Sequence, residues 1–221
     1  MEGERIAIRC AGLALTYPDG TRALDGIDLE IRAGETVAMV GRNGSGKTTL
    51  ARTWNGLLRP SAGTVEIGGL PTTGRRVAEL ARSVGLTFQD PNDQLFARTC
   101  RDEVAFGARN VGLRGEDLKA AIAAALEAVG LGEQAGANPF DLGPSGRRLL
   151  AIASVLAMRT PIVVLDEPTM GLDVAERARV GDIVRNLARE GRTVLAISHD
   201  ARFVADSFDR VVRLDRGRIP D

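Results

Sequence analysis

The chain has 221 residues, with 29 basic and 29 acidic side chains and a formal net charge of zero. Its length allows one large domain or a domain with a small lobe. Its balanced charge gives no overall attraction to nucleic acid or to an anionic membrane. The two cysteines, Cys10 and Cys100, lie far apart without metal-ligand spacing. This argues against a disulfide framework and favours a reducing cytosol.

Neither a secretion signal nor a membrane span is predicted. The start, MEGERIAIRC, lacks a basic region followed by an apolar one. The longest apolar run, LLAIASVLAM, is ended by Arg159 and falls well short of the roughly 18 residues that a span requires. Any role at a membrane is therefore expected to depend on a partner.

The first thirty-odd residues predict a small antiparallel sheet. Apolar side chains recur two residues apart, and the segments YPDG and RAGE mark turns between the runs. The spaced positions are Ile6, Ile8, Leu13, Leu15, Ile27, Leu29 and Ile31. The run TVAMVG that follows predicts a buried strand, and from Lys47 to Leu57 the apolar spacing becomes helical.

Residues 90–145 differ from the rest of the chain. Short strands are predicted at GTVEIGG and SVGLTFQD, but no strongly apolar strand follows until residue 161. Instead, EDLKAAIAAALEAVGLG has one apolar face and a glycine at its end, which predicts an amphipathic helix. We predict a helical lobe at about 90–145, inserted in an α/β core.

After this lobe, predicted strands and helices alternate. Helical patterns at LLAIASVLAM and AERARVGDIVRNLAREG alternate with strands at PIVVLDEP and TVLAISH, and a short helix precedes a last strand at RVVRLD. This alternation predicts a parallel sheet covered by helices. No internal repeat or low-complexity linker is present, so residues 1–221 are expected to form one domain.

The segment GRNGSGKT, residues 41–48, matches the phosphate-loop pattern G-x-x-x-x-G-K-[ST] between a predicted strand and helix. Its glycines let backbone N–H groups form an anion nest, to which the helix N-terminus adds its dipole. Lys47 is expected to reach the β- and γ-phosphates, and the Thr48 hydroxyl to ligate Mg²⁺. The alternative is a flexible glycine turn. The predicted nucleotide-binding residues are Gly41, Arg42, Asn43, Gly44, Ser45, Gly46, Lys47, Thr48 and Thr49.

The fold class predicted is thus α/β, a P-loop NTPase parallel sheet with an N-terminal antiparallel β subdomain and an inserted helical lobe.

Two acids end the apolar strand IVVLDE. A buried carboxylate is costly unless it is paired or binds a metal. Asp166 is expected to bind Mg²⁺ through its water shell, and Glu167 to polarise an attacking water. An ordinary strand exit into solvent is the alternative, but a phosphate loop at the same sheet edge argues against it.

Two further strand ends carry polar side chains. His199, the only histidine, ends TVLAIS, and Gln89 ends SVGLTF. A single histidine is commonly structural or on the surface, yet its place at a parallel strand tip predicts a hydrogen bond to the γ-phosphate. Gln89 is expected to touch Mg²⁺ or the attacking water.

The ordered set GRNGSGKTT, Gln89, VVLDEPTMGLD and His199 resembles the nucleotide-binding subunits of ABC transporters. It is similar to their Walker A, Q-loop, Walker B with D-loop, and switch histidine, over essentially the whole chain. The resemblance implies an ATPase with ATP and Mg²⁺ as cofactors, and Glu167, His199 and Gln89 as its catalytic residues. It implies a D-loop at Gly171, Leu172 and Asp173, and adenine stacking by Tyr17, for which simple packing is the alternative.

The same resemblance implies partners and a location. It predicts a second ABC ATPase subunit, a transmembrane coupling subunit, no nucleic acid, and a peripheral place on the cytoplasmic face of the cell membrane. The run FQDPNDQLFARTCRDEVAFG resembles the energy-coupling factor and cobalt-type branch. It implies an importer of vitamins or transition-metal ions, whose coupling helix docks near Gln89 and this run. The alternative is a generic helical-lobe surface.

The segment DLGPSGRRLLAIA, residues 141–153, departs from the family. Alone it is a helix start, which either binds an anion or simply begins a buried helix. The family's signature reads Leu-Ser-Gly-Gly-Gln and caps ATP bound to the opposite subunit. Here only Leu142 matches, and Pro144 removes one N–H donor. We predict a degenerate signature, and hence a heterodimer rather than a homodimer. The residues of this turn are Gly143, Pro144, Ser145 and Gly146.

Other functions are weighed against this one. The chain could be a regulatory, weakly hydrolysing half of a heterodimer, although its intact Glu167 and His199 count against that. A nucleotide kinase or GTPase is disfavoured by the D-loop and by the lack of an Asn-Lys-x-Asp motif. A DNA-repair ABC ATPase is disfavoured because no long heptad segment or zinc spacing is present.

Overall fold

An antiparallel sheet is formed by the N-terminal part of the chain in the computed structural model, which describes residues 5–220. In the order β2-β1-β4-β5, its strands are β1 (Ile6–Thr16), β2 (Arg22–Arg32), β4 (Ala62–Ile67) and β5 (Leu70–Pro71). Alternate side chains of β1 and β2 are buried, as the two-residue spacing predicts. Residues 1–4 lie outside the described residues. They are the first part of MEGERIAIRC, the segment for which no secretion signal is predicted.

The second sheet is parallel and has the strand order β6-β7-β8-β3-β9. Its strands are β3 (Thr36–Val40), β6 (Val84–Leu86), β7 (Ile162–Asp166), β8 (Thr193–Ile197) and β9 (Arg210–Arg213). All residues of β7 and β8 are buried, because helices or the first sheet cover both faces. The order brings the carboxyl ends of β6, β7, β8 and β3 into one row, although these strands are far apart in the sequence.

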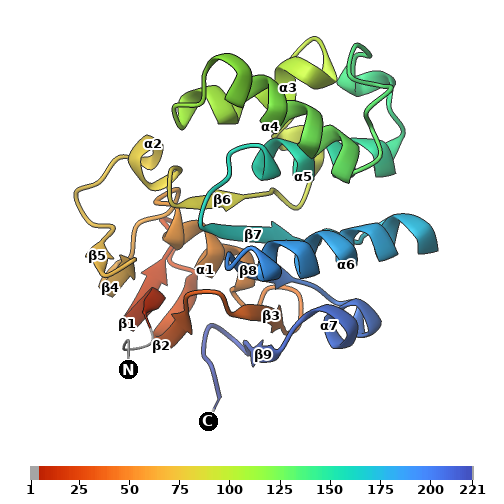
Figure 1. Cartoon of the computed structure of the whole chain (residues 1–221). Coiled ribbons are helices and arrows are strands. Elements are labelled where there is room, and N and C mark those ends of the chain that lie inside the picture. Colours follow the sequence, from red (N-terminus) through yellow and green to blue (C-terminus); the bar gives the residue numbers. More distant parts are fainter. Residues whose placement is uncertain (1–4, 221) are drawn as a thin grey trace.

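The core of the protein has two parts, one on each face of the parallel sheet. Strand β7 contributes to both, since successive side chains point to opposite faces. Val163 and Leu165 pack in the cluster formed with the helices after residue 100, whereas Ile162 and Val164 pack in the cluster formed with the antiparallel sheet. Figure 1 shows this arrangement, with the helical layer on one side of β6 and β7 and the antiparallel sheet on the other.

Helices make up the remaining regular structure. They are α1 (Lys47–Trp54), α2 (Val77–Leu80), α3 (Cys100–Asn110), α4 (Gly115–Ala128), α5 (Pro144–Leu156), α6 (Val174–Arg189) and α7 (Ala201–Ser207), with 3₁₀ turns η1 (Pro91–Asp93) and η2 (Pro139–Asp141). Helices α3, α4 and α5 share one apolar cluster, so the helical layer predicted for about 90–145 continues through α5. Within residues 5–220, no helix is long and apolar enough to cross a membrane.

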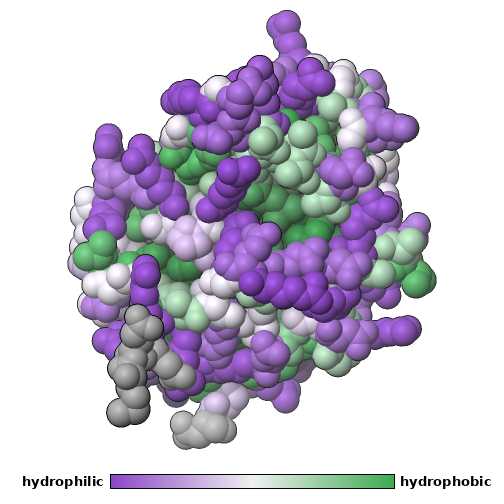
Figure 2. Space-filling model, in the orientation of Figure 1, coloured by the Kyte–Doolittle hydropathy of each residue, from purple (hydrophilic) through white to green (hydrophobic). Residues whose placement is uncertain are grey.

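Most of the face seen in Figure 2 is hydrophilic, but apolar side chains lie in a hollow between the helical layer and α6. This groove has a volume of about 420 Å³. Alanines of α4 line it together with Leu156, Ile183 and Leu187. It lies outside the row of strand ends described above.

Candidate functional site

The loop between β3 and α1 curls around the side chain of the lysine that follows it. Lys47 Nζ donates to the carbonyl oxygens of Gly41, at 2.7 Å, and Arg42, at 3.0 Å. Gly46 has a φ of +104°, and a Cβ there would lie 2.6 Å from Ala23 O, so a side chain does not fit. The loop therefore has the tight curvature that an anion nest requires.

Thr48 and Asp166 join this loop to the end of β7. Thr48 Oγ1 donates to Asp166 Oδ2 over 2.8 Å, and Asp166 N donates to Thr87 Oγ1 over 3.0 Å. Asp166 Oδ1 is buried and has no hydrogen-bond partner among the described residues. Burial raises the pKa of Asp166, opposed by the Thr48 hydrogen bond and nearby cations. A free carboxylate oxygen beside a hydroxyl fits a hard cation such as Mg²⁺.

Glu167 and His199 lie at the ends of adjacent strands. His199 Nε2 lies 3.3 Å from Glu167 Oε1. Glu167 has a φ of +48°, an uncommon conformation for a side chain of this size and one found at functional sites. Its N–H donates to Ile197 O over 2.9 Å. Burial raises the pKa of Glu167, and His199 acts in the opposite direction.

These groups share one cleft of about 480 Å³. Tyr17 is in its wall, where its hydroxyl lies 3.0 Å from Thr49 Oγ1. The predicted residues that line the cleft are Tyr17, Asn43, Gly44, Ser45, Gly46, Lys47, Thr48, Thr49, Gln89, Asp166, Glu167 and His199. Gly41 and Arg42 contribute through the carbonyls that accept from Lys47. The predicted signature and D-loop residues do not line this cleft.

Comparisons with known proteins show the family of this chain. A family profile described as ABC transporter matches residues 24–170. A relative from Streptomyces avermitilis, assigned as an ABC transporter ATP-binding protein, is 46% identical over 209 residues, which are 95% of this chain and 79% of that protein. The chain belongs to the ABC transporter family of ATP-binding proteins. It is an ATPase of the ATP-binding cassette type, and the resemblance drawn from its motifs is confirmed.

Other members of the ABC transporter family agree with this assignment. The energy-coupling factor transporter ATP-binding protein EcfA of Methanothermobacter thermautotrophicus is 40% identical over 214 residues, or 96% of this chain and 69% of that protein. The chain spans 37–40% of the length of three longer relatives from Methanosarcina and Caldanaerobacter.

Two solved ABC structures confirm the fold class predicted from the sequence. CbiO1 of Clostridium perfringens, part of the ABC transporter complex CbiONQ, has a TM-score of 0.86 at 33% identity over 99% of this chain and 88% of its own. The cassette MJ0796, seen as a dimer in a post-hydrolysis state bound to ADP and Pi, has a TM-score of 0.89 at 26% identity over 97% of each chain.

The turn predicted to be a degenerate signature lies at the start of α5. Pro144 occupies the first helical position and Gly143 the N-cap, without a side-chain cap. Proline is tolerated at this position because its missing N–H would have no helical acceptor. Ser145 and Gly146 are half-buried in the first turn, and a Cβ on Gly146 would lie 3.2 Å from Leu142 Cβ. A larger side chain at residue 146 therefore requires Leu142 to move by a few tenths of an ångström.

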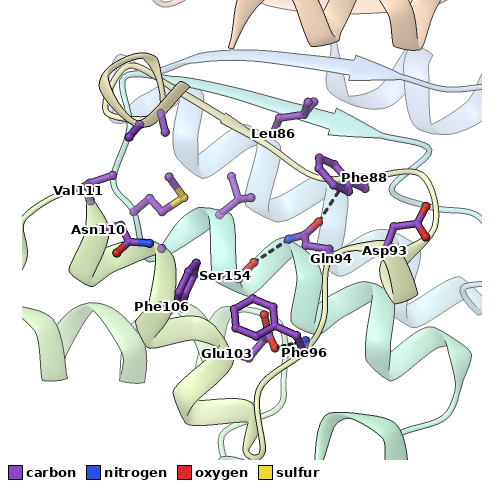
Figure 3. Close-up of a pocket in the computed structure, with 15 residues that line it drawn as sticks. Leu86, Phe88, Asp93, Gln94, Phe96, Glu103, Phe106, Asn110, Val111 and Ser154 are labelled. Atoms are coloured by element: carbon purple, nitrogen blue, oxygen red, sulfur yellow. Dashed lines mark hydrogen bonds between the residues drawn. The ribbon is translucent and has the colours of Figure 1, made fainter. Parts of the chain in front are cut away.

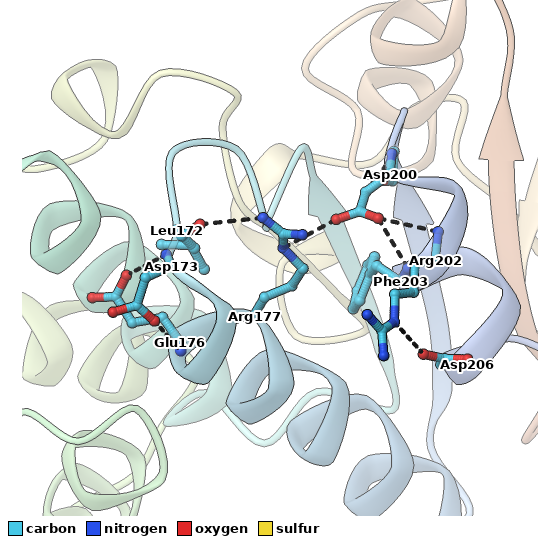
Figure 4. A network of polar contacts seen from close by, with 9 residues as sticks. Leu172, Asp173, Glu176, Arg177, Asp200, Arg202, Phe203 and Asp206 are labelled. Carbon is cyan, nitrogen blue, oxygen red and sulfur yellow. Dashed lines mark hydrogen bonds and ion pairs between the residues drawn. The ribbon is translucent and has the colours of Figure 1, made fainter.

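The predicted D-loop, residues 171–173, precedes α6 and is connected through Arg177 to the segment after His199 (Figure 4). Asp173 and Glu176 cap α6 reciprocally, each side chain accepting from the other's N–H. Arg177 donates to Leu172 O over 3.3 Å and forms an ion pair with Asp200. Asp200 also caps α7 by accepting from two N–H groups.

A second groove, of about 680 Å³, lies between β6 and the helical layer (Figure 3). The rings of Phe96 and Phe106 meet edge to face at 4.8 Å and are 60% and 50% exposed. Gln94 accepts from Phe88 N and donates to Ser154 Oγ, at 3.0 and 2.8 Å. The run 88–107 singled out in the sequence therefore lines an apolar groove.

Several residues near the site were not predicted from the sequence. Thr21, Arg22 and Ala23 line the cleft after the YPDG turn, and Thr87 accepts from Asp166 N. Arg148 is buried and donates to carbonyls next to the cleft. Thr87 lies just beyond β6, within the segment SVGLTFQD that is predicted as a strand, so its place near the strand end could have indicated a site residue. Nothing in the sequence distinguishes Arg148 from the adjacent Arg147.

Proposed function

We propose that this chain binds ATP with Mg²⁺ in the cleft and hydrolyses it to drive a membrane transporter. The observation that carries the proposal is the buried Asp166 Oδ1, which accepts no hydrogen bond from any residue of 5–220 and lies beside Thr48 at the phosphate loop. Thr48, Asp166 and Gln89 would hold Mg²⁺, which neutralises charge on the β- and γ-phosphates when it is bound. Tyr17 would lie against the adenine.

In the proposed reaction, the protein mainly positions groups and stabilises charge. The Lys47 ammonium, which donates to the carbonyl oxygens of Gly41 and Arg42, would turn toward the γ-phosphate. Glu167 Oε1 orients the attacking water and accepts its proton. His199 Nε2 donates to the γ-phosphate while it stays next to Glu167.

This proposal predicts distinct effects of two substitutions. Lys47→Ala should weaken ATP binding, measured by titration with a fluorescent ATP analogue. Glu167→Gln should leave that binding within about twofold but lower phosphate release by about 100-fold or more, since a general base contributes on this scale. Unchanged phosphate release in Glu167→Gln would contradict the proposed role of Glu167.

A second ATPase subunit completes the proposed site. Because the turn at 143–146 lacks the signature sequence, we favour a heterodimer in which the partner's intact signature caps ATP on this chain. The post-hydrolysis dimer of MJ0796 supports a paired assembly. Phosphate release should rise when the purified chain is mixed with such a partner. Strong cooperative hydrolysis by the chain alone would count against the heterodimer.

The groove between β6 and the helical layer is the proposed site of a transmembrane subunit. Its exposed rings, Phe96 and Phe106, fit an apolar helix, and it adjoins the strand that leads to Gln89. Together with EcfA and CbiO1 as relatives, this supports an energy-coupling factor type importer of vitamins or transition-metal ions, on the cytoplasmic face of the cell membrane. Phe96→Asp should prevent co-purification with membrane subunits and leave ATP binding unchanged.

The difference between residues 143–146 and the family's signature sequence also favours a second function. The chain could act as a regulatory, weakly hydrolysing half while its partner carries most turnover. Transport by the assembled complex distinguishes the two functions. If Glu167→Gln abolishes transport, this chain supplies necessary hydrolysis; if transport is unchanged, the regulatory function is correct.

A further inference from the structure

Arg148 is a buried arginine of α5 that contacts two other elements of the site. It is 8% exposed. Its Nη1 donates to Gln89 O and to Glu167 O, at 3.0 Å each. Burying a guanidinium is costly unless its N–H groups are accepted and its charge is compensated. Its position therefore depends on two carbonyls that belong to segments predicted to act in hydrolysis.

The surroundings of Arg148 show what is particular to it. The neighbouring Arg147 contacts the same run of chain, since its Nη1 donates to Asn92 Oδ1 over 3.1 Å. Gln94 also binds α5, donating to Ala151 O over 3.1 Å. The run 89–94 is thus attached to α5 at successive turns. Of these attachments, the one through Arg148 also reaches the residue that follows β7.

Glu167 is the residue whose backbone needs such support. Its φ of +48° is uncommon and is maintained only where neighbours hold the backbone. Its N–H donates to Ile197 O, and its carbonyl accepts from Met170 N at 3.3 Å as well as from Arg148. The backbone is therefore held on both sides, which sets the direction of the carboxylate beside His199.

We propose that Arg148 is a positioning residue for ATP hydrolysis, which fixes Glu167 and Gln89 relative to the first turn of α5. This inference rests on the proposed function. That turn is the predicted degenerate signature, and the run after Gln89 is proposed to meet a membrane subunit. Through Arg148, a displacement of α5 or of this run moves the backbone of Glu167. Arg148 itself does not line the cleft.

Three variants of the full chain, assembled with its partner subunits, test the inference. Arg148→Met removes both hydrogen bonds, Arg148→Lys keeps a donor of similar reach, and Arg147→Met is the matched control. Arg148→Met should lower kcat by about tenfold or more, with the KM for ATP within about twofold, because it removes positioning rather than binding. Arg148→Lys should recover part of kcat, and Arg147→Met should stay close to the wild type.

Hydrogen–deuterium exchange of the ligand-free chain gives a second measurement that does not require hydrolysis. Amides near Gln89 and Glu167 should exchange faster in Arg148→Met than in the wild type, and Arg147→Met should leave those near Glu167 unchanged. An unchanged kcat or unchanged exchange at both segments overturns the inference, as does an equal effect of Arg147→Met. If the wild-type complex hydrolyses no ATP, the proposed function fails, and the exchange measurement still decides the role of Arg148.

Discussion

Arg177 Nε lies 3.2 Å from Oδ2 of Asp200, the residue that directly follows His199. The same guanidinium donates to Leu172 O in the predicted D-loop. The D-loop and the segment that carries His199 are therefore connected within one chain. In a dimer whose second subunit contacts the D-loop, this connection lets the position of His199 respond to the partner.

Arg177→Met is expected to lower the kcat for ATP several-fold in the assembled complex, with little effect on ATP affinity. The reason is that His199 loses a constraint on its neighbour, while the phosphate loop is untouched. Arg202→Met is the matched control, because Arg202 is exposed and pairs with Asp206 instead. Steady-state phosphate release and an ATP titration measure both quantities. Equal losses in the two variants would argue for a general effect on α7 rather than a D-loop connection.

The pH dependence of hydrolysis should reflect the buried position of Glu167. Burial raises the pKa of this carboxyl above its ordinary value of 4.5. A base must be ionised to accept a proton, so kcat/KM should fall as the pH drops through the raised pKa. The acid limb of the profile is thus expected above pH 4.5. Circular dichroism at each pH controls for unfolding, and an acid limb at or below the ordinary value would contradict the prediction.

The parts of the site that are local in the chain could be predicted from the sequence. GRNGSGKT and IVVLDE are contiguous, and their chemistry follows from a strand that ends in a glycine turn or in acids. The order of the strands, with β8 between β7 and β3, depends on crossovers that no local pattern specifies. It is this order that places His199 next to Glu167.

Helix α3 and the role of Arg148 could not be predicted from the sequence, because each depends on the burial of a charged side chain. Helix α3 buries Glu103, whose carboxylate accepts from the N–H groups of Phe96 and Ala97 at 2.8 and 2.7 Å. This charge on its inner face obscures the apolar periodicity that would mark a helix. Arg147 and Arg148 are likewise indistinguishable as letters, and only the packing of α5 determines which of them is buried.

Asp166→Asn should make the ligand-free protein more stable at neutral pH. Burial raises the pKa of Asp166 above its ordinary 3.8, so its ionised form disfavours folding above the raised pKa and has no such effect once the pH falls below 3.8. In a protein of this size, each kcal/mol of unfolding free energy gained raises the Tm by about 2–4 °C. The gain in Tm should therefore shrink as the pH falls from the raised pKa of Asp166 to 3.8.

Thermal unfolding without Mg²⁺ measures this effect, and Asp182→Asn serves as an exposed control that should change little. ATP with Mg²⁺ should raise the Tm of the wild type more than that of Asp166→Asn, because a ligand that binds only the folded state stabilises it. A lower Tm for Asp166→Asn at neutral pH would show that the carboxylate stabilises the ligand-free fold.

Restoring the signature should increase hydrolysis on the opposite subunit. The variant combines G143S, P144G, S145G and G146Q. Replacing Pro144 returns one backbone N–H to the first turn of α5, and one donor in an oxyanion hole is worth about 100-fold or more in kcat. The substitutions are made together with Glu167→Gln, so that hydrolysis in the assembled complex comes from the partner's cleft. Phosphate release at saturating ATP is expected to rise by about 100-fold.

Two single variants separate the contributions to that gain. Pro144→Ala returns the N–H alone and should give a smaller increase. Gly146→Gln alone should give none, because Pro144 still lacks the backbone N–H donor. An unchanged rate in the fourfold variant would mean that the native turn, with Ser145 and its free N–H groups, already caps the partner's nucleotide. The argument for a heterodimer would then lose its basis, since two copies of this chain would each supply a working cap.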